Sequence, residues 1–250
     1  MADDTSIGGA ARGFPLTRRS AIAGVRSEDA RERERSLESI IAAYWKPVYK
    51  YIRIKWGKPN EDAKDLTQEF FATALEKSFF ASYDAAKGRF RTFLRVCLDA
   101  FIANQERAGR RLKRGGDLQL VSLEFESVEG ELKTIDVPSP HSTETYFDTE
   151  WVRSLLGIGV EALRAECEAS GKQVHFKLFE RYDLERPATG APTYDELAKE
   201  FGIPATQVTN HLAFARREFR RLLLDKLREL TINDEEFRLE ARFLLGTGFE

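Results

Sequence analysis

The chain has 250 residues, of which 42% are hydrophobic and 32% are charged, enough to bury a hydrophobic core in one or two domains. Two cysteines exclude a disulfide-rich scaffold, and no apolar run approaches the ~20 residues that span a bilayer. The formal net charge is −2, but residues 87–114 carry nine bases against two acids, and residues 117–150 carry nine acids against one Lys. Such a chain can present a basic, phosphate-binding surface while being neutral overall.

The first dozen residues are mostly small and polar, and we expect a disordered N-terminal tail over residues 1–25. Arg18-Arg19 resembles the start of a twin-arginine export signal, but the apolar run behind it ends at Arg26. We therefore expect no export signal and a cytoplasmic protein with reduced thiols.

Three amphipathic helices are predicted over residues 26–114 and can close a small helical domain. The first carries apolar residues at helical spacing from Leu37 to Ile52, and the second starts at Asn60, a good N-cap residue. The third starts at Phe90 and continues into a basic cluster that ends at Gly115-Gly116.

The rest of the chain predicts a linker and a second helical domain. Residues 115–150 are acidic, contain two prolines and lack a sustained helical period, which indicates a linker. A second domain is expected over 151–230, followed by a C-terminal extension over 231–250. The predicted fold is all-α, with two helical domains joined by an acidic linker.

The strongest local motif is a helix-turn-helix in residues 193–208. Thr193 and Glu196 form a capping box, and Ala198, Gly202 and Val208 have the spacing of the small, turn and anchor positions. The exposed side of the second helix then presents polar residues to a DNA major groove, followed by arginines for phosphates. These residues are Thr206, Gln207, Thr209, Asn210, Arg216, Arg217 and Arg220.

Two charged surfaces are also predicted in the first domain. The third helix and the loop before it combine bases with aromatic residues, a pattern typical of nucleic-acid binding. The second helix carries Asp62, Asp65 and Glu69 with Gln68 on the side opposite its apolar face. Spacing alone leaves open whether this acidic stripe serves solubility or docks a basic protein.

Catalytic motifs are missing from the sequence. It has no phosphate-binding Walker loop, no G-x-G-x-x-G and no H-E-x-x-H, and its cysteines lack metal-ligand spacing. We therefore expect a protein that is not an enzyme and that uses no metal and no cofactor.

The order of motifs along the chain resembles that of one protein family. The motifs are the segment from Asp62 to Phe71, the segment from Phe90 to Leu94, the basic helix end, the acidic linker and the helix-turn-helix. They resemble an extracytoplasmic-function (ECF) sigma factor of bacterial RNA polymerase, and the match spans roughly residues 37–114 and 151–227. The resemblance implies a region 2-like domain over 26–114 and a region 4-like domain over 151–230.

The resemblance also implies roles for individual residues. Asp62, Asp65, Gln68 and Glu69 would dock on the β′ clamp of core RNA polymerase, and the helix-turn-helix would hold the minus-thirty-five element. The implied contacts to the unstacked minus-ten element are Tyr83, Lys87, Arg89, Arg91, Arg95, Asn104, Arg107, Arg110 and Arg111. The implied partners are core polymerase (β′ clamp and β flap), promoter DNA, and an anti-sigma factor or a Ser/Thr kinase, with no membrane.

A regulatory hypothesis comes from one departure from the family pattern. Lys64 stands where the family often has an acid, and phosphorylation of Thr67 would add about −1.5 to −2 charges beside Asp65 and restore docking. Two alternatives to a sigma factor remain open: a stand-alone helix-turn-helix repressor, and a helical adaptor whose basic faces bind acidic proteins.

Overall fold

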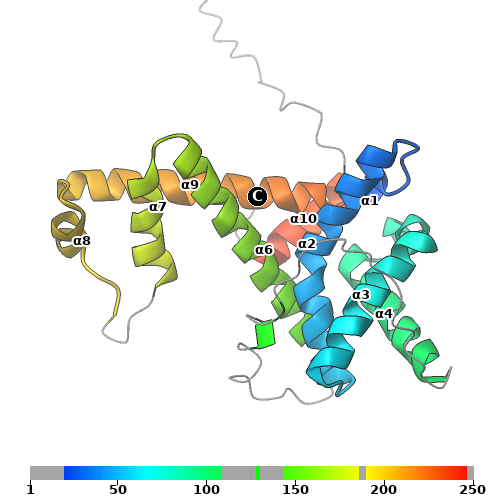
Figure 1. Cartoon of the computed structure of the whole chain (residues 1–250). Coiled ribbons are helices and arrows are strands. Elements are labelled where there is room, and N and C mark those ends of the chain that lie inside the picture. The colour runs from blue at the N-terminus through cyan, green and yellow to red at the C-terminus, as the bar shows by residue number, and fades with distance from the viewer. Residues whose placement is uncertain (1–19, 108–124, 126–127, 130–142, 186–189, 247–250) are drawn as a thin grey trace, which may run out of the picture.

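The structure is a computed structural model, and the residues that it describes form helices, turns and loops without a strand (Figure 1). The described residues are 20–107, 125, 128–129, 143–185 and 190–246. The predicted all-α class is confirmed for these residues. Within the same residues, no helix combines the length and the apolar character needed to cross a membrane.

The N-terminal helices form where the sequence has amphipathic patterns. They are α1 (Ala21–Gly24), α2 (Ala30–Lys55), α3 (Asn60–Glu76) and α4 (Phe90–Arg107), with short turns η1 (Phe79–Ser82) and η2 (Ala85–Lys87) before α4. The predicted apolar face of α2 is buried from Leu37 to Ile52. Pro59, rather than Asn60, occupies the N-cap of α3, so that helix starts one residue earlier than predicted. Whether α4 continues to residue 114 lies outside the described residues.

The predicted N-terminal tail is too long. Ser20 caps α1, because its hydroxyl accepts a hydrogen bond from the backbone N–H of Ala23 at 3.3 Å. Ala21 and Ile22 are buried in the core. The prediction of disorder is therefore wrong for residues 20–25, and residues 1–19 lie outside the described part of the chain.

The long helix α6 (Thr143–Ala169) starts inside the region predicted as a linker. It packs against α2 and buries Phe147, Trp151 and Leu155 there. Upstream, Phe125 is buried with its ring 5.2 Å from that of Trp45. The predicted linker boundary at residue 150 is therefore wrong, since the acidic residues just before it belong to an amphipathic helix.

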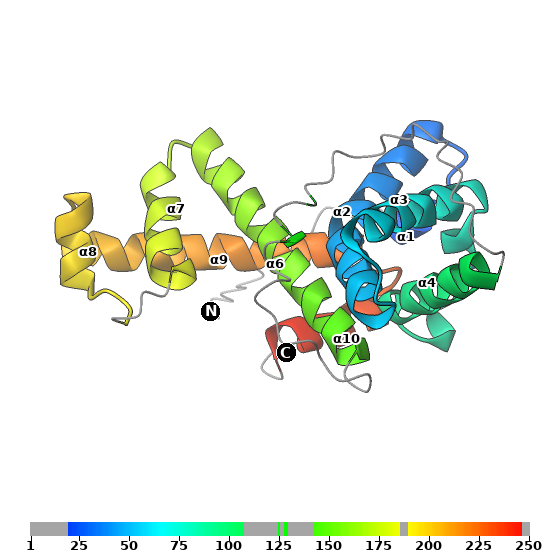
Figure 2. The same cartoon turned by 60° about the horizontal axis from the view of Figure 1, so that its bottom comes forward.

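The C-terminal part consists of one long helix with two shorter helices toward one of its ends and a third shorter helix at the other end (Figure 1). Its elements are α7 (Gln173–Phe179) with the turn η4 (Glu180–Leu184), α8 (Tyr194–Phe201), α9 (Ala205–Glu229) and α10 (Asp234–Leu245). With 25 residues, α9 is about 37 Å long. Figures 1 and 2 show α9 extending from α8 at one end of the molecule to α10 and α2 at the other.

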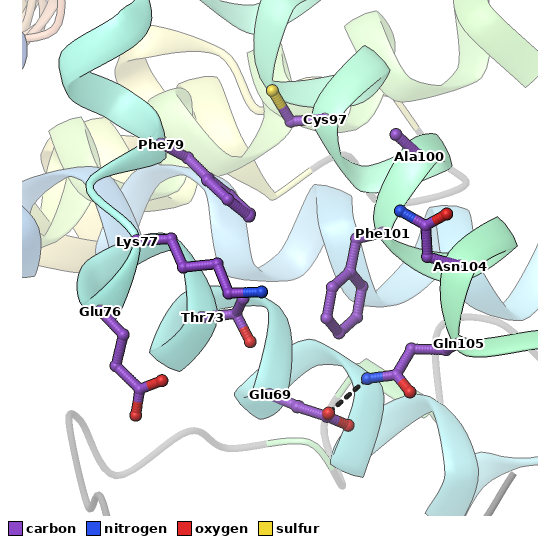
Figure 3. Close-up of a pocket in the computed structure, with 10 residues that line it drawn as sticks. All are labelled: Glu69, Thr73, Glu76, Lys77, Phe79, Cys97, Ala100, Phe101, Asn104 and Gln105. Atoms are coloured by element: carbon purple, nitrogen blue, oxygen red, sulfur yellow. Dashed lines mark hydrogen bonds between the residues drawn. The ribbon is translucent and has the colours of Figure 1, made fainter. Parts of the chain in front are cut away.

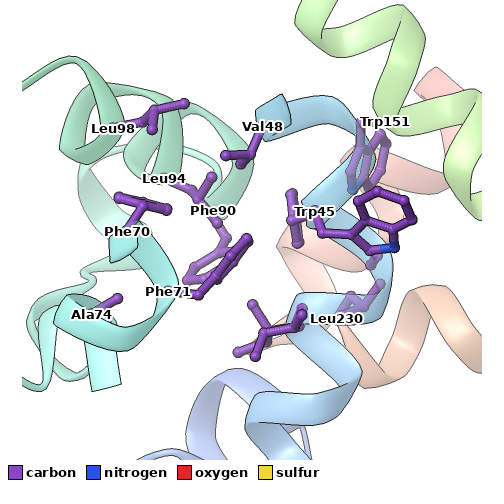
Figure 4. Close-up of a cluster of buried hydrophobic side chains, with 14 of the residues drawn as sticks. Trp45, Val48, Phe70, Phe71, Ala74, Phe90, Leu94, Leu98, Trp151 and Leu230 are labelled. Carbon is purple, nitrogen blue, oxygen red and sulfur yellow. The ribbon is translucent and has the colours of Figure 1, made fainter. Parts of the chain in front are cut away.

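The main hydrophobic core joins the two predicted domains. It contains buried side chains of α1, α2, α3, α4, α6, α9 and α10 in one continuous cluster. Figure 4 shows Phe70 of α3 and Leu94 of α4 on one side of α2, with Trp151 of α6 on its other side. Residues 231–245, predicted as an extension, belong to this core through Phe237 and Ala241.

Candidate nucleic-acid interface

The helix-turn-helix forms through the predicted local interactions. Thr193 caps α8: its backbone N–H donates to Glu196 Oε2 at 2.7 Å, and the Glu196 N–H donates to Thr193 Oγ1 at 3.3 Å. Gly202 ends α8 in the left-handed region at φ +64°, a conformation that favours glycine. The backbone N–H of Ile203 then donates to Ala198 O at 3.0 Å, which closes the turn before α9.

A small separate core orients the second helix of this motif. Val208 and Leu212 of α9 are buried against Leu197 of α8 and Leu178 of α7. Because these residues fix which side of α9 faces inward, the opposite side faces solvent. The polar residues predicted to read DNA, namely Thr206, Gln207, Thr209 and Asn210, all lie exposed on this outer side.

The arginines that follow on α9 are also exposed, but they differ in their ion pairs. Arg216 donates two hydrogen bonds to the carboxylate of Asp183, at 2.8 and 2.9 Å. Arg217 lies 3.4 Å from Glu218, and Arg220 is exposed one turn further along. This part of α9 therefore adds positive charge next to the polar reading face.

The acidic stripe predicted for polymerase docking lies on α3. Asp65 and Gln68 are exposed, whereas Asp62 and Glu69 are half-buried. Glu69 accepts a hydrogen bond from Gln105 Nε2 of α4. The Lys64 ammonium, which stands within the stripe, lies 3.0 Å from Glu61, so part of its charge is compensated.

The structure does not support the hypothesis that Thr67 is phosphorylated. The Thr67 side chain is fully buried, and its hydroxyl donates to the carbonyl oxygen of Ala63 at 2.7 Å. A kinase cannot reach this hydroxyl while α3 stays packed. A phosphate in the core would also lack the solvation that a dianion requires, so we do not retain this hypothesis.

The residues predicted to bind the minus-ten element divide into three groups. Lys87, Asn104 and Arg107 are exposed, and 83% of the Lys87 side chain is open to solvent. Arg110 and Arg111 lie outside the described residues. The remaining four, Tyr83, Arg89, Arg91 and Arg95, are covered by acidic side chains from α6 and α10.

Arg91 is the most enclosed of these residues, with only 2% of its side chain exposed. Its guanidinium lies 2.7 Å from Glu240 of α10 and 3.1 Å from Asp148 of α6. The same group lies over two rings, 3.9 Å from the centroid of Phe243 and 4.7 Å from that of Trp151. Arg91 therefore joins three helices instead of facing solvent.

A second carboxylate of α10 covers the start of α4. Glu236 Oε1 accepts from the Tyr83 hydroxyl at 2.7 Å and from the backbone N–H of Phe90 at 2.8 Å. One turn beyond Arg91, the Arg95 guanidinium lies 2.5 Å from Glu144 of α6. Sequence reasoning missed Glu236 and Glu240 altogether; their i, i+4 spacing on a C-terminal amphipathic helix is the signal that could have identified them.

Burial changes the acid–base properties of this cluster. It raises the pKa of Glu240 to about 7, against the lowering effect of the nearby Arg91 and Arg89. Burial likewise lowers the pKa of Arg91 and raises that of Tyr83, where the hydrogen bond to Glu236 adds to the effect. Glu240 is therefore largely ionised only above neutral pH.

A cavity of about 520 Å³ opens between α3, η1 and α4. Figure 3 shows Phe79 and Phe101 within it, with Asn104 and Gln105 along the α4 side and Glu69 below. Asn104, predicted to contact the minus-ten element, thus borders a hollow and lies on a face of α4 that α10 leaves uncovered.

The described residues contain no group of three or more His, Cys, Asp or Glu side chains arranged to hold a metal ion. Their arrangement defines an all-α protein with a helix-turn-helix unit whose second helix extends into the main core. Comparison with family models, with curated proteins and with solved structures found no match.

Proposed function

We propose that the chain is a sigma factor of the ECF type, a non-enzymatic subunit that directs core RNA polymerase to promoters. The observation that carries this proposal is the first turn and a half of α9. There Thr206, Gln207, Thr209 and Asn210 are exposed together, while Val208 and Leu212 fix the helix against α8. Side chains of this kind form hydrogen bonds with base edges in a major groove.

Two further surfaces support the choice of a sigma factor over a repressor. The exposed Asp65 and Gln68 on α3 offer a site for a basic surface of the polymerase clamp. On the loop before α4 and on α4 itself, Lys87 and Arg107 are exposed and can bind the phosphates of a melted strand, whereas Arg91 and Arg95 are covered by carboxylates. A stand-alone repressor would need the helix-turn-helix and a dimer interface, and it has no use for the acidic stripe on α3.

The proposed mechanism divides DNA recognition between the two ends of the molecule. The exposed face of α9 would bind duplex DNA at the minus-thirty-five element, with Arg216, Arg217 and Arg220 on phosphates. The loop before α4 and α4 itself would bind unstacked bases of the minus-ten element, where a basic groove offsets the few kcal/mol that unstacking costs. Docking of α3 would place both contacts on one polymerase.

The direct test is binding of the purified chain to core RNA polymerase. We expect Asp65→Lys to weaken binding by at least tenfold, because it reverses an exposed charge at the centre of the docking stripe. Glu168→Lys is the matched control, since it makes the same charge change at an exposed position of α6, and it should alter the affinity less than twofold. Equal effects of the two variants, or duplex DNA binding without any polymerase binding, would contradict the proposal.

The reading face of α9 gives a second expected result. Asn210→Ala should lower discrimination between the preferred and a mutated minus-thirty-five duplex by about 1–3 kcal/mol, roughly 5- to 150-fold, because a paired base edge loses its partner. Arg217→Ala should weaken all duplexes alike and make the log–log salt slope shallower by about 0.9. Competition binding at several salt concentrations separates these effects. If Asn210→Ala weakened all sequences equally, the assigned base contact would be wrong.

A further inference from the structure

Four carboxylates, two from α6 and two from α10, lie against the loop before α4 and the first two turns of α4. Glu236 and Glu240 come from α10, and Asp148 and Glu144 come from α6. Their partners are Tyr83, the backbone N–H of Phe90, Arg91 and Arg95. Under the proposed function these partners belong to the minus-ten binding surface.

The carboxylates occupy positions that suit the phosphates of DNA. The N-terminus of an α-helix attracts anions because its first backbone N–H groups are unpaired and its dipole is positive there. In this structure Glu236 accepts from one such group, the N–H of Phe90, at 2.8 Å. Glu240 lies 2.7 Å from the guanidinium of Arg91, a group that otherwise binds phosphate with two parallel hydrogen bonds.

Some side chains of α10 are buried in the main core and others remain exposed to solvent. Phe237 and Ala241 are buried in the main core, and the Phe243 ring lies over Arg91 at 3.9 Å. Phe243 remains 44% exposed beside this contact, and Leu239 is 41% exposed. The apolar side of α10 therefore packs into the main core, while its carboxylates and the Phe243 ring contact Tyr83 and Arg91.

We propose that α10 is an autoinhibitory helix that, in the free chain, covers Tyr83 and the first turn of α4, which are part of the proposed minus-ten surface. Its carboxylates occupy the sites of DNA phosphates, so the single strand binds only after α10 has moved away. The inference rests on the proposed function, which supplies the reason for α4 to bind DNA, and it adds the element that controls access to α4. Docking on polymerase would then have to release α10 before the strand binds.

The test uses the full-length chain at pH 8, where Glu240 is ionised, and no polymerase. Glu240→Lys places an ammonium against Arg91 and Arg89, and like-charge repulsion should detach α10. Glu235→Lys makes the same charge change at an exposed position of the same helix, and is the matched control. Binding of a fluorescein-labelled, A/T-rich single-stranded oligonucleotide is measured beside hydrogen exchange of the α10 amides.

We expect Glu240→Lys to lose α10 protection and to bind the oligonucleotide at least tenfold more tightly than Glu235→Lys. Its log–log salt slope should be steeper by about 1.4, because Arg89 and Arg91 lose Glu240 as a partner and each phosphate contact on a single strand adds about 0.7. Loss of α10 protection without a gain in affinity over the control would overturn the proposal. Unchanged protection of α10 would overturn it as well.

A milder variant decides the question if Glu240→Lys fails to fold. Phe243→Ala removes the ring over Arg91 from a half-exposed position, and Leu239→Ala is its control on the same helix. We expect Phe243→Ala to bind the oligonucleotide severalfold more tightly than Leu239→Ala, and equal affinities would refute the proposal. Failure of the proposed function has a different signature, which is the absence of polymerase binding by the wild-type chain.

Discussion

Replacing Trp151 with alanine is expected to lower the free energy of unfolding by about 3–5 kcal/mol, the usual cost of truncating a large buried aromatic residue. Trp151 is only 1% exposed, and its ring stacks on Tyr44 with 6.4 Å between centroids. The same ring lies 4.7 Å from the Arg91 guanidinium. The substitution therefore leaves a cavity and removes one aromatic face from a buried cation.

Chemical denaturation followed by circular dichroism measures this effect. Because the main core contains side chains from α2, α6, α9 and α10, we expect one cooperative transition at lower denaturant concentration. Leu156→Ala, at an exposed position on the same helix, should cost less than about 1 kcal/mol. Two separate transitions, or a cost for Trp151→Ala no larger than that of the control, would show that the two predicted domains do not share this core.

The second large effect is expected at the buried ion pair between α2 and α6. Lys50 Nζ lies 2.6 Å from Glu150 Oε2, and both side chains are only 2% exposed. Glu150→Leu removes the carboxylate that pairs with this buried ammonium, so it should destabilise the protein by about 3–5 kcal/mol. Lys50→Met should cost less, because Glu150 keeps the Arg153 guanidinium as a partner.

A double-mutant cycle tests this explanation. The variant Lys50→Met/Glu150→Leu has no uncompensated charge at the pair, and apolar replacements of a buried pair are often neutral. We expect the double variant to be more stable than either single variant. Additive losses from the two substitutions would mean that the pair is not coupled, and that each side chain acts through other contacts.

The local features of the fold could be predicted because neighbouring residues determine them. The capping box of Thr193 and Glu196 and the turn at Gly202 depend on residues a few positions apart. The apolar spacing of α2 and α4 likewise gave their buried faces. Such patterns need no knowledge of what packs against them.

The start of α6 could not be predicted in this way. Glu144, Asp148 and Glu150 make the segment look like an acidic linker, because their partners Arg95, Arg91 and Lys50 lie far away in the sequence. Only the tertiary structure shows that these charges are compensated. The same separation in sequence concealed the role of α10.

The exposed residues of the candidate site could be predicted from the sequence, but its buried residues could not. The exposed positions on α9 follow from which residues of a helix must be buried, so Gln207 and Asn210 could be named. The burial of Arg91 could not, since a basic residue on an amphipathic helix is normally exposed. Thr67 had a local signal that went unused: it lies four residues after the buried Ala63 and four before the buried Phe71.

Reconstituted transcription is the decisive experiment for the proposed sigma-factor function. Core RNA polymerase is incubated with a library of bacterial promoter fragments, with and without the chain, and transcript starts are mapped. If the chain is a sigma factor, new starts appear at discrete positions that depend on the chain and share two sequence elements. These starts disappear with Asp65→Lys but persist with Glu168→Lys. No chain-dependent starts, or only the repression of existing ones, would contradict the sigma-factor function.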